Sequence, residues 1–339
     1  MRIFEGYRHG INFGGWFSQC DNSEERYDSF IKDEDFSQVA LWGLDHVRIP
    51  IDYELVLNED FSYKEKGIER IQRCIELCRD NGLNMILDLH KTPGFSFDPG
   101  EMQTGFFESE KYQQIFFDLW DTLAKRFGHN NNLAFELLNE VTDESYCDIW
   151  NDIASKAIEV IRKSSKDIPI LVGGYHNNSV TAVKDLRLPE DDRLIYNFHC
   201  YNPLIFTHQG AYWIAPMDRG FRVSIKEEPE KLRGYGEKNL YPGYDDIGSY
   251  GRKIDETYFE ELFKEAIEVA ERKDVPLYCG EYGVIDLADP DDTLEWFRYI
   301  SKIFEKYGIG RAVWSYREMD FGLTGEHYEG IRKELIKLL

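Results

Sequence analysis

Two glutamates follow short apolar runs that are typical of buried strands. Glu140 ends the run "NLAFELLNE", and Glu281 lies in "PLYCGEYG". Holding a carboxylate at the end of a buried strand costs free energy unless the charge is paired, so such a residue often has a function. Two carboxyl groups that face each other can cut a glycosidic bond, because one protonates the leaving oxygen while the other attacks the sugar or activates a water. The two acids can act in this way only if the fold brings them together.

Other polar and aromatic residues also end strand-like runs. They are Arg48, His90, Asn139, His199, Tyr201 and Trp314. In a barrel of parallel strands the carboxyl ends of all strands meet at one mouth, where the chemistry is found. A single strand-end glutamate most often makes only a salt bridge, and a lone barrel histidine is often structural. Two glutamates together with these six neighbours favour a catalytic site.

Short β-branched or aromatic runs alternate with longer amphipathic stretches along the chain. Eight runs are typical of strands buried on both faces: "GINFGGWF", "DHVRIPI", "NMILDLH", "NLAFELLNE", "IPILVGG", "LIYNFHCY", "PLYCGEYG" and "RAVWSYR". Stretches between them, such as 65–82 and 293–308, repeat apolar residues with a helical period and end at glycines. This alternation predicts an α/β fold, a (β/α)8 TIM barrel that forms a single catalytic domain over residues 1–339. An open doubly wound sheet is the rival, but neither GxGxxG nor a P-loop follows an early strand.

One connection is much longer than the others. About fifty residues separate "LIYNFHCY" from the amphipathic stretch 256–273, and so long a connection is rare in a compact domain unless it is functional. We expect residues 203–251 to form a small subdomain inserted after strand six, at the C-terminal face of the barrel, as one wall of the substrate site. Trp213 in this segment is a candidate to bind the leaving-group side of the substrate. The alternative is that Trp213 fills the core of the subdomain.

The composition limits the kinds of partner. The chain has 339 residues and a formal net charge of -23 at pH 7, so nucleic acid and anionic membranes are not expected as partners. Aromatic residues make up 15% of the chain, which allows a surface that stacks on the flat apolar faces of sugars. No window suits a membrane span and the N-terminus has no long apolar signal region. The location stays open between the cytoplasm and secretion with the signal removed.

The cysteines and histidines do not form a metal-binding pattern. The six cysteines are Cys20, Cys74, Cys78, Cys147, Cys200 and Cys279. None forms a CxxC pair, so neither a disulfide framework nor a zinc site is predicted. A metal-dependent barrel hydrolase that uses His90 and His199 is an alternative, but such barrels usually have an HxH pair on the first strand, which here reads "GINFGGWF". We expect no metal, no other cofactor and a monomer.

The ordered set "HVRIP", "DLH", "LLNE", "NFHCY", "CGEYG" and "AVWSY" resembles glycoside hydrolase family five, a family of retaining barrel enzymes with acids on strands four and seven. The match runs over nearly the whole chain. Within the family the chain looks most like the compact clostridial endoglucanases of the endoglucanase C type, which also carry a subdomain after strand six. The Asn-Glu pair is a specific signal, whereas "DLH" is weak. The chain departs from the family pattern at Val141, which follows Asn139 and Glu140 where many relatives have a proline.

The resemblance implies a role for each strand-end residue. Glu140 corresponds to the acid/base, which must be protonated to work, so we expect burial and its carboxylate partner to raise its pKa. Glu281 corresponds to the nucleophile, which must stay ionised, with Arg48 and Tyr201 placed to hydrogen-bond it. The others would bind sugar or orient the acids: Asn139 at the 2-hydroxyl, His90 and His199 at hydroxyls or the acids, and Trp314 as the platform for the sugar at the cleaved bond.

The implied activity is that of a retaining endo-β-glucanase. It would hydrolyse β-1,4-glucan or mixed-linkage β-1,3-1,4-glucan by double displacement, through a covalent glycosyl-enzyme intermediate, with a β-glucan polysaccharide or oligosaccharide as its partner. Endo-β-mannanase and xylanase of the same family are alternatives, because loop geometry decides which hydroxyls are recognised. An alternative of another class is a non-catalytic glycan-binding barrel, for which paired acids would have no use.

Overall fold

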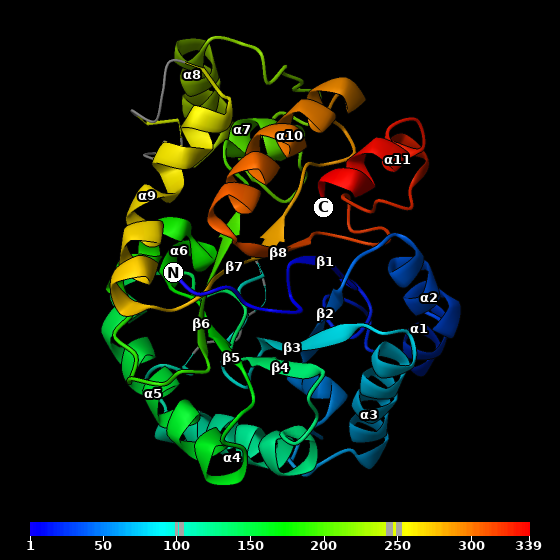
Figure 1. Cartoon of the computed structure of the whole chain (residues 1–339), viewed down its shortest axis with the longest axis vertical. Coiled ribbons are helices and arrows are strands. Elements are labelled where there is room, and N and C mark those ends of the chain that lie inside the picture. The colour runs from blue at the N-terminus through cyan, green and yellow to red at the C-terminus, as the bar shows by residue number, and fades with distance from the viewer. Residues whose placement is uncertain (99–100, 102–104, 242–246, 249–252) are drawn as a thin grey trace.

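The computed structural model describes residues 1–98, 101, 105–241, 247–248 and 253–339. In this part of the chain, eight parallel strands close into one barrel in chain order, with β1 paired to β8 (Figure 1). The predicted (β/α)8 barrel is confirmed. The strands are β1 (His9–Asn12), β2 (His46–Asp52), β3 (Asn84–Lys91), β4 (Leu133–Glu136), β5 (Ile170–Val172), β6 (Leu194–Cys200), β7 (Leu277–Tyr282) and β8 (Gly310–Val313).

Helices surround the barrel (Figure 1). The long ones are α3 (Glu65–Asp80), α4 (Glu110–Phe127), α5 (Cys147–Ser164), α9 (Glu256–Lys273) and α10 (Pro290–Tyr307). The short ones are α1 (Glu24–Ser29), α2 (Asp33–Leu41), α6 (Tyr175–Asn178), α7 (Leu204–Thr207), α8 (Pro229–Asn239) and α11 (Arg332–Leu335), with single 3-10 turns η1 (Tyr53–Leu55), η2 (Glu144–Tyr146), η3 (Val180–Asp185), η4 (Glu326–Tyr328) and η5 (Ile336–Leu338). No described helix has the length and apolar character that a membrane crossing requires.

The long helices begin and end where their sequence provides caps. The carboxylate of Asp289 accepts hydrogen bonds from the first backbone amides of α10. Pro290 occupies the first turn, where a backbone N–H would have no partner within the helix, so its absence in proline costs nothing. The same helix ends at Gly308, whose φ of +68° suits glycine. On α3, the buried residues include Ile68, Ile71 and Ile75, which lie on one face of the helix. The helical period and the glycine stop therefore predicted these two helices to within a few residues.

The inside of the barrel changes from apolar to polar along its axis. Alternate residues of a strand point to the same side, so Ile86, Asp88 and His90 of β3 share the barrel interior. Ile86 belongs to an apolar cluster contributed by several strands together with Phe4 and Tyr7. Asp88 and His90, further along the same strand, are both buried. The charged and polar side chains thus lie between an apolar plug and the carboxyl ends of the strands.

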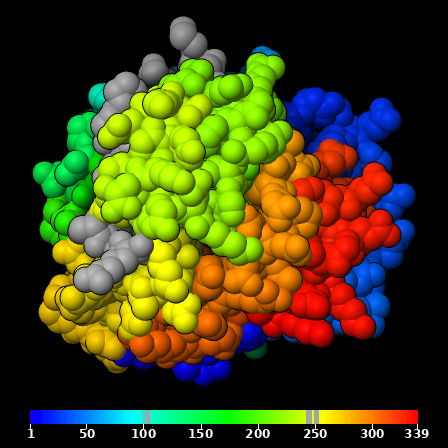
Figure 2. Space-filling view, turned by 90° about the horizontal axis from the view of Figure 1, so that it is seen from above, coloured from blue at the N-terminus to red at the C-terminus, as the bar shows by residue number. Residues whose placement is uncertain are grey.

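The long connection after β6 contains α7 and α8, and two of its rings, His208 and Trp213, pack against Phe321, which follows β8. Figure 2 shows it in yellow-green as a layer on one face of the molecule, beside α10 in orange. Its buried apolar residues, which include Ile214, Ile225 and Leu232, belong to the same core as the barrel. Residues 242–246 and 249–251 of the predicted subdomain lie outside the described residues, and the division of the chain at 203–251 stays a proposal.

Candidate active site

The structure brings Glu140 and Glu281 together at the carboxyl ends of the strands. One carboxylate oxygen of each, with one ring nitrogen of His199, lie within 4.8 Å of one another. The register pairs His199 of β6 with Glu281 of β7. Strand β4 ends earlier than predicted, at Glu136, so Glu140 lies in the following loop and not at the strand end. The loop stays in place because the backbone amide of Asn139 donates to the carbonyl of Leu89 on β3, at 3.1 Å.

Glu281 accepts a hydrogen bond on each carboxylate oxygen. Arg48 Nη1 donates to Oε1 at 2.8 Å, and the hydroxyl of Tyr201 donates to Oε2 at 2.9 Å. Burial and the nearby carboxylates raise the pKa of Tyr201, so its hydroxyl keeps its proton and remains a donor. Both contacts stabilise a negative charge on the Glu281 carboxylate. They are the two contacts that the resemblance led us to expect.

Glu140 also has both oxygens engaged, but by neutral donors. His199 Nδ1 lies 2.8 Å from Oε1, and Asn177 Nδ2 donates to Oε2 at 2.9 Å. Burial raises the pKa of Glu140 to about 7, and the negative charge of Asp98 adds to this, whereas the Asn177 hydrogen bond and Arg48 oppose it. Burial also lowers the pKa of His199 to about 4, so its imidazole is neutral near pH 7 and donates from Nδ1. A carboxyl group with a pKa near 7 can give up a proton in one step and take one in the next.

Arg48 is the centre of a fully buried polar network below the two acids. Its guanidinium forms a two-point ion pair with Glu136, at 2.7 and 2.9 Å, and lies 3.0 Å from Asp88. Arg48 also donates to the side-chain oxygens of Asn12 and Asn139, at 2.9 and 2.7 Å. One cation therefore contacts the carboxylates of three strands, and the position of Glu281 depends on how these carboxylates hold the guanidinium.

Four members of this network were not predicted from the sequence: Asn12, Asp88, Glu136 and Asn197. Asn197 donates to Glu136 at 2.8 Å and accepts from the amide of Gly280, the residue before Glu281, at 3.0 Å. These residues lie below the mouth, whereas the prediction considered only strand ends. The two-residue period of a strand could have found two of them, because Asp88 and Asn197 each precede a predicted histidine by two positions.

Asn139 and His199 each keep one polar atom without a partner among the described residues: Asn139 Nδ2 and His199 Nε2. Both atoms are buried, so leaving them unpaired is costly in the free protein. Asn139 is oriented by Arg48, which uses its side-chain oxygen and leaves the amide nitrogen to donate. The two atoms are suited to bind sugar hydroxyls.

His90 and Trp314 form the aromatic side of the site. The His90 and Trp314 rings are parallel to within 1°, with centroids 5.9 Å apart, and His90 Nδ1 lies 2.5 Å from Asp88. Burial keeps the pKa of His90 well below its usual range, so the ring is neutral. A Cβ at Gly14 would lie 2.6 Å from the indole of Trp314, which explains why a glycine stands there. Eight of the predicted residues thus lie in one connected group.

Trp213 is the exception, because it lies one layer of rings away from this group. Its indole contacts His208 and Phe321, with centroids at 5.8 and 6.3 Å. Both of these rings contact Tyr201, at 5.0 and 5.7 Å. Trp213 is half-buried, so the structure leaves it available both to the subdomain core and to a ligand beyond Tyr201.

Among the described residues, one cluster could in principle coordinate a metal ion, and it consists of Glu140, His199 and Glu281. The surroundings suit such an ion poorly, because a buried guanidinium already lies 2.8 Å from Glu281. A divalent cation would have to displace the donors from Arg48 and Tyr201 and would meet the positive charge that remains. The donor set therefore fits two acids better than a metal centre.

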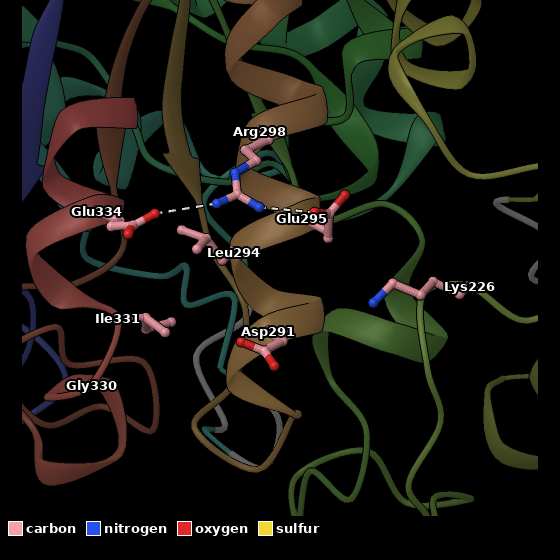
Figure 3. A pocket seen from close by; sticks show the side chains of 8 residues that line it. All are labelled: Lys226, Asp291, Leu294, Glu295, Arg298, Gly330, Ile331 and Glu334. Atoms are coloured by element: carbon pink, nitrogen blue, oxygen red, sulfur yellow. Dashed lines mark hydrogen bonds and ion pairs between the residues drawn. The ribbon is translucent and has the colours of Figure 1, made fainter.

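A separate surface cavity of about 480 Å³ lies between α10, the α11 segment and Lys226 of the insertion (Figure 3). Arg298 pairs there with Glu295 and Glu334, at 2.8 and 3.3 Å. Its lining contains no aromatic ring and none of the predicted site residues. The lining residues are Lys226, Asp291, Leu294, Glu295, Arg298, Gly330, Ile331 and Glu334.

Comparisons with known proteins agree with this geometry. A family model described as Cellulase (glycosyl hydrolase family 5) matches residues 9–320. Cellodextrinase A of Ruminococcus flavefaciens is 48% identical over 307 residues, which are 90% of this chain and 84% of that protein. Endoglucanase C of Acetivibrio thermocellus is 37% identical over 339 residues, 98% of each chain. The resemblance to the endoglucanase C type is therefore confirmed.

Solved structures show the same barrel. An endoglucanase from the hyperthermophilic Thermotoga maritima is 25% identical, has a TM-score of 0.75, and covers 98% of this chain and 97% of that chain. The family match begins at the first residue of β1 and extends past β8, so it includes both glutamates and the strands that hold them. The chain belongs to glycosyl hydrolase family 5, the cellulase family, and is a glycoside hydrolase.

Proposed function

We propose that the chain is an endo-β-glucanase that hydrolyses β-1,4-glucan or mixed-linkage β-1,3-1,4-glucan with retention of anomeric configuration. The closeness of Glu140 and Glu281 is the observation that carries the retaining mechanism. Oxygens of the two carboxylates approach within 4.8 Å. Retaining glycosidases hold their carboxyl groups about 5–5.5 Å apart, whereas inverting ones need about 6.5–9.5 Å to admit a water.

In the first step, protonated Glu140 donates its proton to the leaving glycosidic oxygen while an oxygen of Glu281 attacks the anomeric carbon. The bond to the leaving sugar breaks as the glycosyl-enzyme ester forms. Arg48 and Tyr201 hold the Glu281 carboxylate by one hydrogen bond on each oxygen. The Nδ2 atom of Asn139 donates to the sugar 2-hydroxyl, a contact that strengthens in the transition state.

In the second step, ionised Glu140 takes a proton from a water that attacks the anomeric carbon and releases Glu281. Glu140 must therefore lose and regain one proton in each cycle. Its pKa of about 7 suits both requirements near neutral pH. His199 is neutral in this range and holds Oε1 without competing for the proton.

The names of the relatives support glucan as the substrate class, since they are a cellodextrinase and an endoglucanase. Structures of the Thermotoga maritima enzyme were solved with cellobiose and with mannotriose, so a barrel of this fold can hold sugars of both kinds. The assay must therefore include mannan and xylan, so that mannanase or xylanase activity can be told apart from glucanase activity.

The test is a parallel assay on lichenan, carboxymethyl cellulose, xylan and mannan. We expect reducing ends to appear on the two glucans, with an early loss of viscosity that marks internal cleavage. The first product seen by NMR should be the β-anomer. Early α-anomer would contradict retention, and activity confined to xylan or mannan would contradict the glucan assignment. The Glu140→Gln and Glu281→Gln variants control for a contaminating hydrolase.

A further inference from the structure

A left-handed turn follows β5 and is fastened to the ends of two neighbouring strands. His176, Asn177 and Asn178 have φ values of +51°, +55° and +57°. Side chains other than glycine rarely adopt this conformation, and asparagine adopts it most readily. The amide of Asn177 donates to the carbonyl of Val141, next to Glu140, at 2.9 Å. Ser179 forms a parallel bridge with His199 of β6.

The turn points one amide side chain at Glu140. Asn177 Nδ2 donates to Oε2 at 2.9 Å, while buried His199 holds the other oxygen from inside the barrel. Asn177 is exposed, so its contact is on the solvent side of the carboxyl group. A proton on Oε2 would face the N–H of Asn177, and a carboxylate oxygen accepts a hydrogen bond more strongly when it is ionised, so this contact favours the ionised form of Glu140.

We propose that Asn177 is a positioning residue that sets the proton affinity of Glu140 and so keeps the ionised form accessible for the second step. This inference rests on the proposed function, in which Glu140 is the acid/base. A hydrogen bond donated to a carboxylate favours the charged form. Without it, a larger share of Glu140 would be protonated at neutral pH, and less of the base would be present for the attack by water.

Other charged or titratable groups also face Glu140. They are His199 on β6, Glu281 on β7, Arg48 on β2, Asp88 on β3 and Asp98 in the following loop. Burial and Asp98 raise the pKa of Glu140, and Arg48 lowers it. Asn177 is uncharged and exposed, so its replacement removes one hydrogen bond and changes none of these charges.

The experiment compares pH profiles of kcat/KM on a soluble cello-oligosaccharide for the parent and for Asn177→Gly, Asn177→Ala and Asn177→Asp. Glycine removes the amide and accepts the left-handed turn without strain. We expect the alkaline limb, which reports the acid in the free enzyme, to move up by about half a pKa unit in the Gly and Ala variants, a threefold change in proton affinity. The Asp variant should move it up by about one unit, because it adds a negative charge.

His176→Ala is the matched control, because His176 is exposed in the same turn and is not bonded to Glu140. Its alkaline limb should stay at the parent position. An aryl cellobioside with a good leaving group provides a second readout, because its departure needs no proton. For this substrate the pH dependence of the first step, measured as the burst of released aryl alcohol, should show no alkaline limb that moves with the Asn177 substitutions, and a limb that moves would contradict the inference.

A parent-like alkaline limb in Asn177→Gly, or a shift to lower pH, overturns the inference. An equal shift in His176→Ala also overturns it, because the cause would then be the turn and not the amide. The same experiment includes Glu140→Gln. If that variant still cleaves the oligosaccharide, the proposed function falls and the inference with it; if it is inactive and Asn177→Gly is parent-like, only the inference falls.

Discussion

At the scale of single residues, the two glutamates differ in the donors that surround them. A cation and a phenol bind Glu281, whereas a neutral imidazole and an amide bind Glu140. Identical side chains thereby lie in different surroundings, and burial raises the pKa of Glu140. This difference is what a division into acid and nucleophile requires, and it can be tested one residue at a time.

Replacing Glu140 or Glu281 by Gln is expected to abolish polysaccharide turnover while the fold is kept. General acid–base catalysis alone contributes about 10²–10⁴-fold. On an aryl glycoside with a good leaving group, Glu140→Ala should keep its first step and be rescued by azide, because departure then needs no proton. Glu281→Ala should not recover a retained product. Equal and unrescued loss in both variants would contradict the assigned roles.

The activity should fall as pH rises through about 7. The pKa of Glu140 is raised to about 7, so its acidic form is present below that value and is lost above it. We expect kcat/KM on a glucan oligosaccharide to show an alkaline limb near pH 7, measured over the range from pH 4 to 9. A limb near the ordinary glutamate value would mean that burial does not raise the pKa of this acid in solution.

Tyr201→Phe should reduce kcat/KM by about tenfold or more. The change removes one hydrogen bond to the Glu281 carboxylate and leaves the ring contacts with His208 and Phe321 in place. Hydrogen bonds to charged groups are worth about 1.5–3 kcal/mol. The melting temperature serves as the control, since an unchanged value with lower activity separates chemistry from stability. Parent-like kinetics would show that Arg48 alone holds the carboxylate.

At the scale of elements, the strands were the most predictable part and the loops the least. Each β-strand matches a run that the sequence identified and extends at most one residue beyond it, because burial on both faces leaves a continuous apolar signal. The end of β4 was misplaced because Leu137 and Leu138, which follow the strand, are also buried and extend the apolar run. The contact of Asn177 with Glu140 depends on a left-handed turn in a loop, and no periodicity in the sequence encodes that geometry.

The insertion after β6 gives a prediction at the same scale. Trp213→Ala should lower kcat/KM on polymer by about tenfold, since a lost stacking contact is worth on the order of 1 kcal/mol. Hydrolysis of an aryl glucoside that occupies only the other side of the cleaved bond should be spared. Tyr212→Ala is the matched control, because Tyr212 is 63% exposed and lies edge-on to Trp213. A loss of melting temperature with equal harm to both substrates would assign Trp213 to the subdomain core.

At the scale of the whole molecule, the net charge of -23 should distinguish charged from neutral glucans. Carboxymethyl cellulose is a polyanion, and a negative protein repels it at low salt. Raising the ionic strength from about 10 to 150 mM shortens the Debye length to about 8 Å. We expect kcat/KM on carboxymethyl cellulose to rise by about two- to tenfold, with lichenan unchanged. An equal response of both substrates would trace the effect to the site itself.

The Arg48 network has a consequence for how such an enzyme can be altered. The Glu281 carboxylate is held by Arg48, which is itself fixed by side chains of the barrel strands, whereas Trp213, the candidate to contact the rest of a polysaccharide, belongs to the insertion. Exchanging the segment after β6 for that of a relative would leave every bond to the Arg48 guanidinium untouched, but the replacement must keep a ring where His208 packs against Tyr201. Selection or design can therefore change the substrate range of such an enzyme while the residues that hold its nucleophile stay the same.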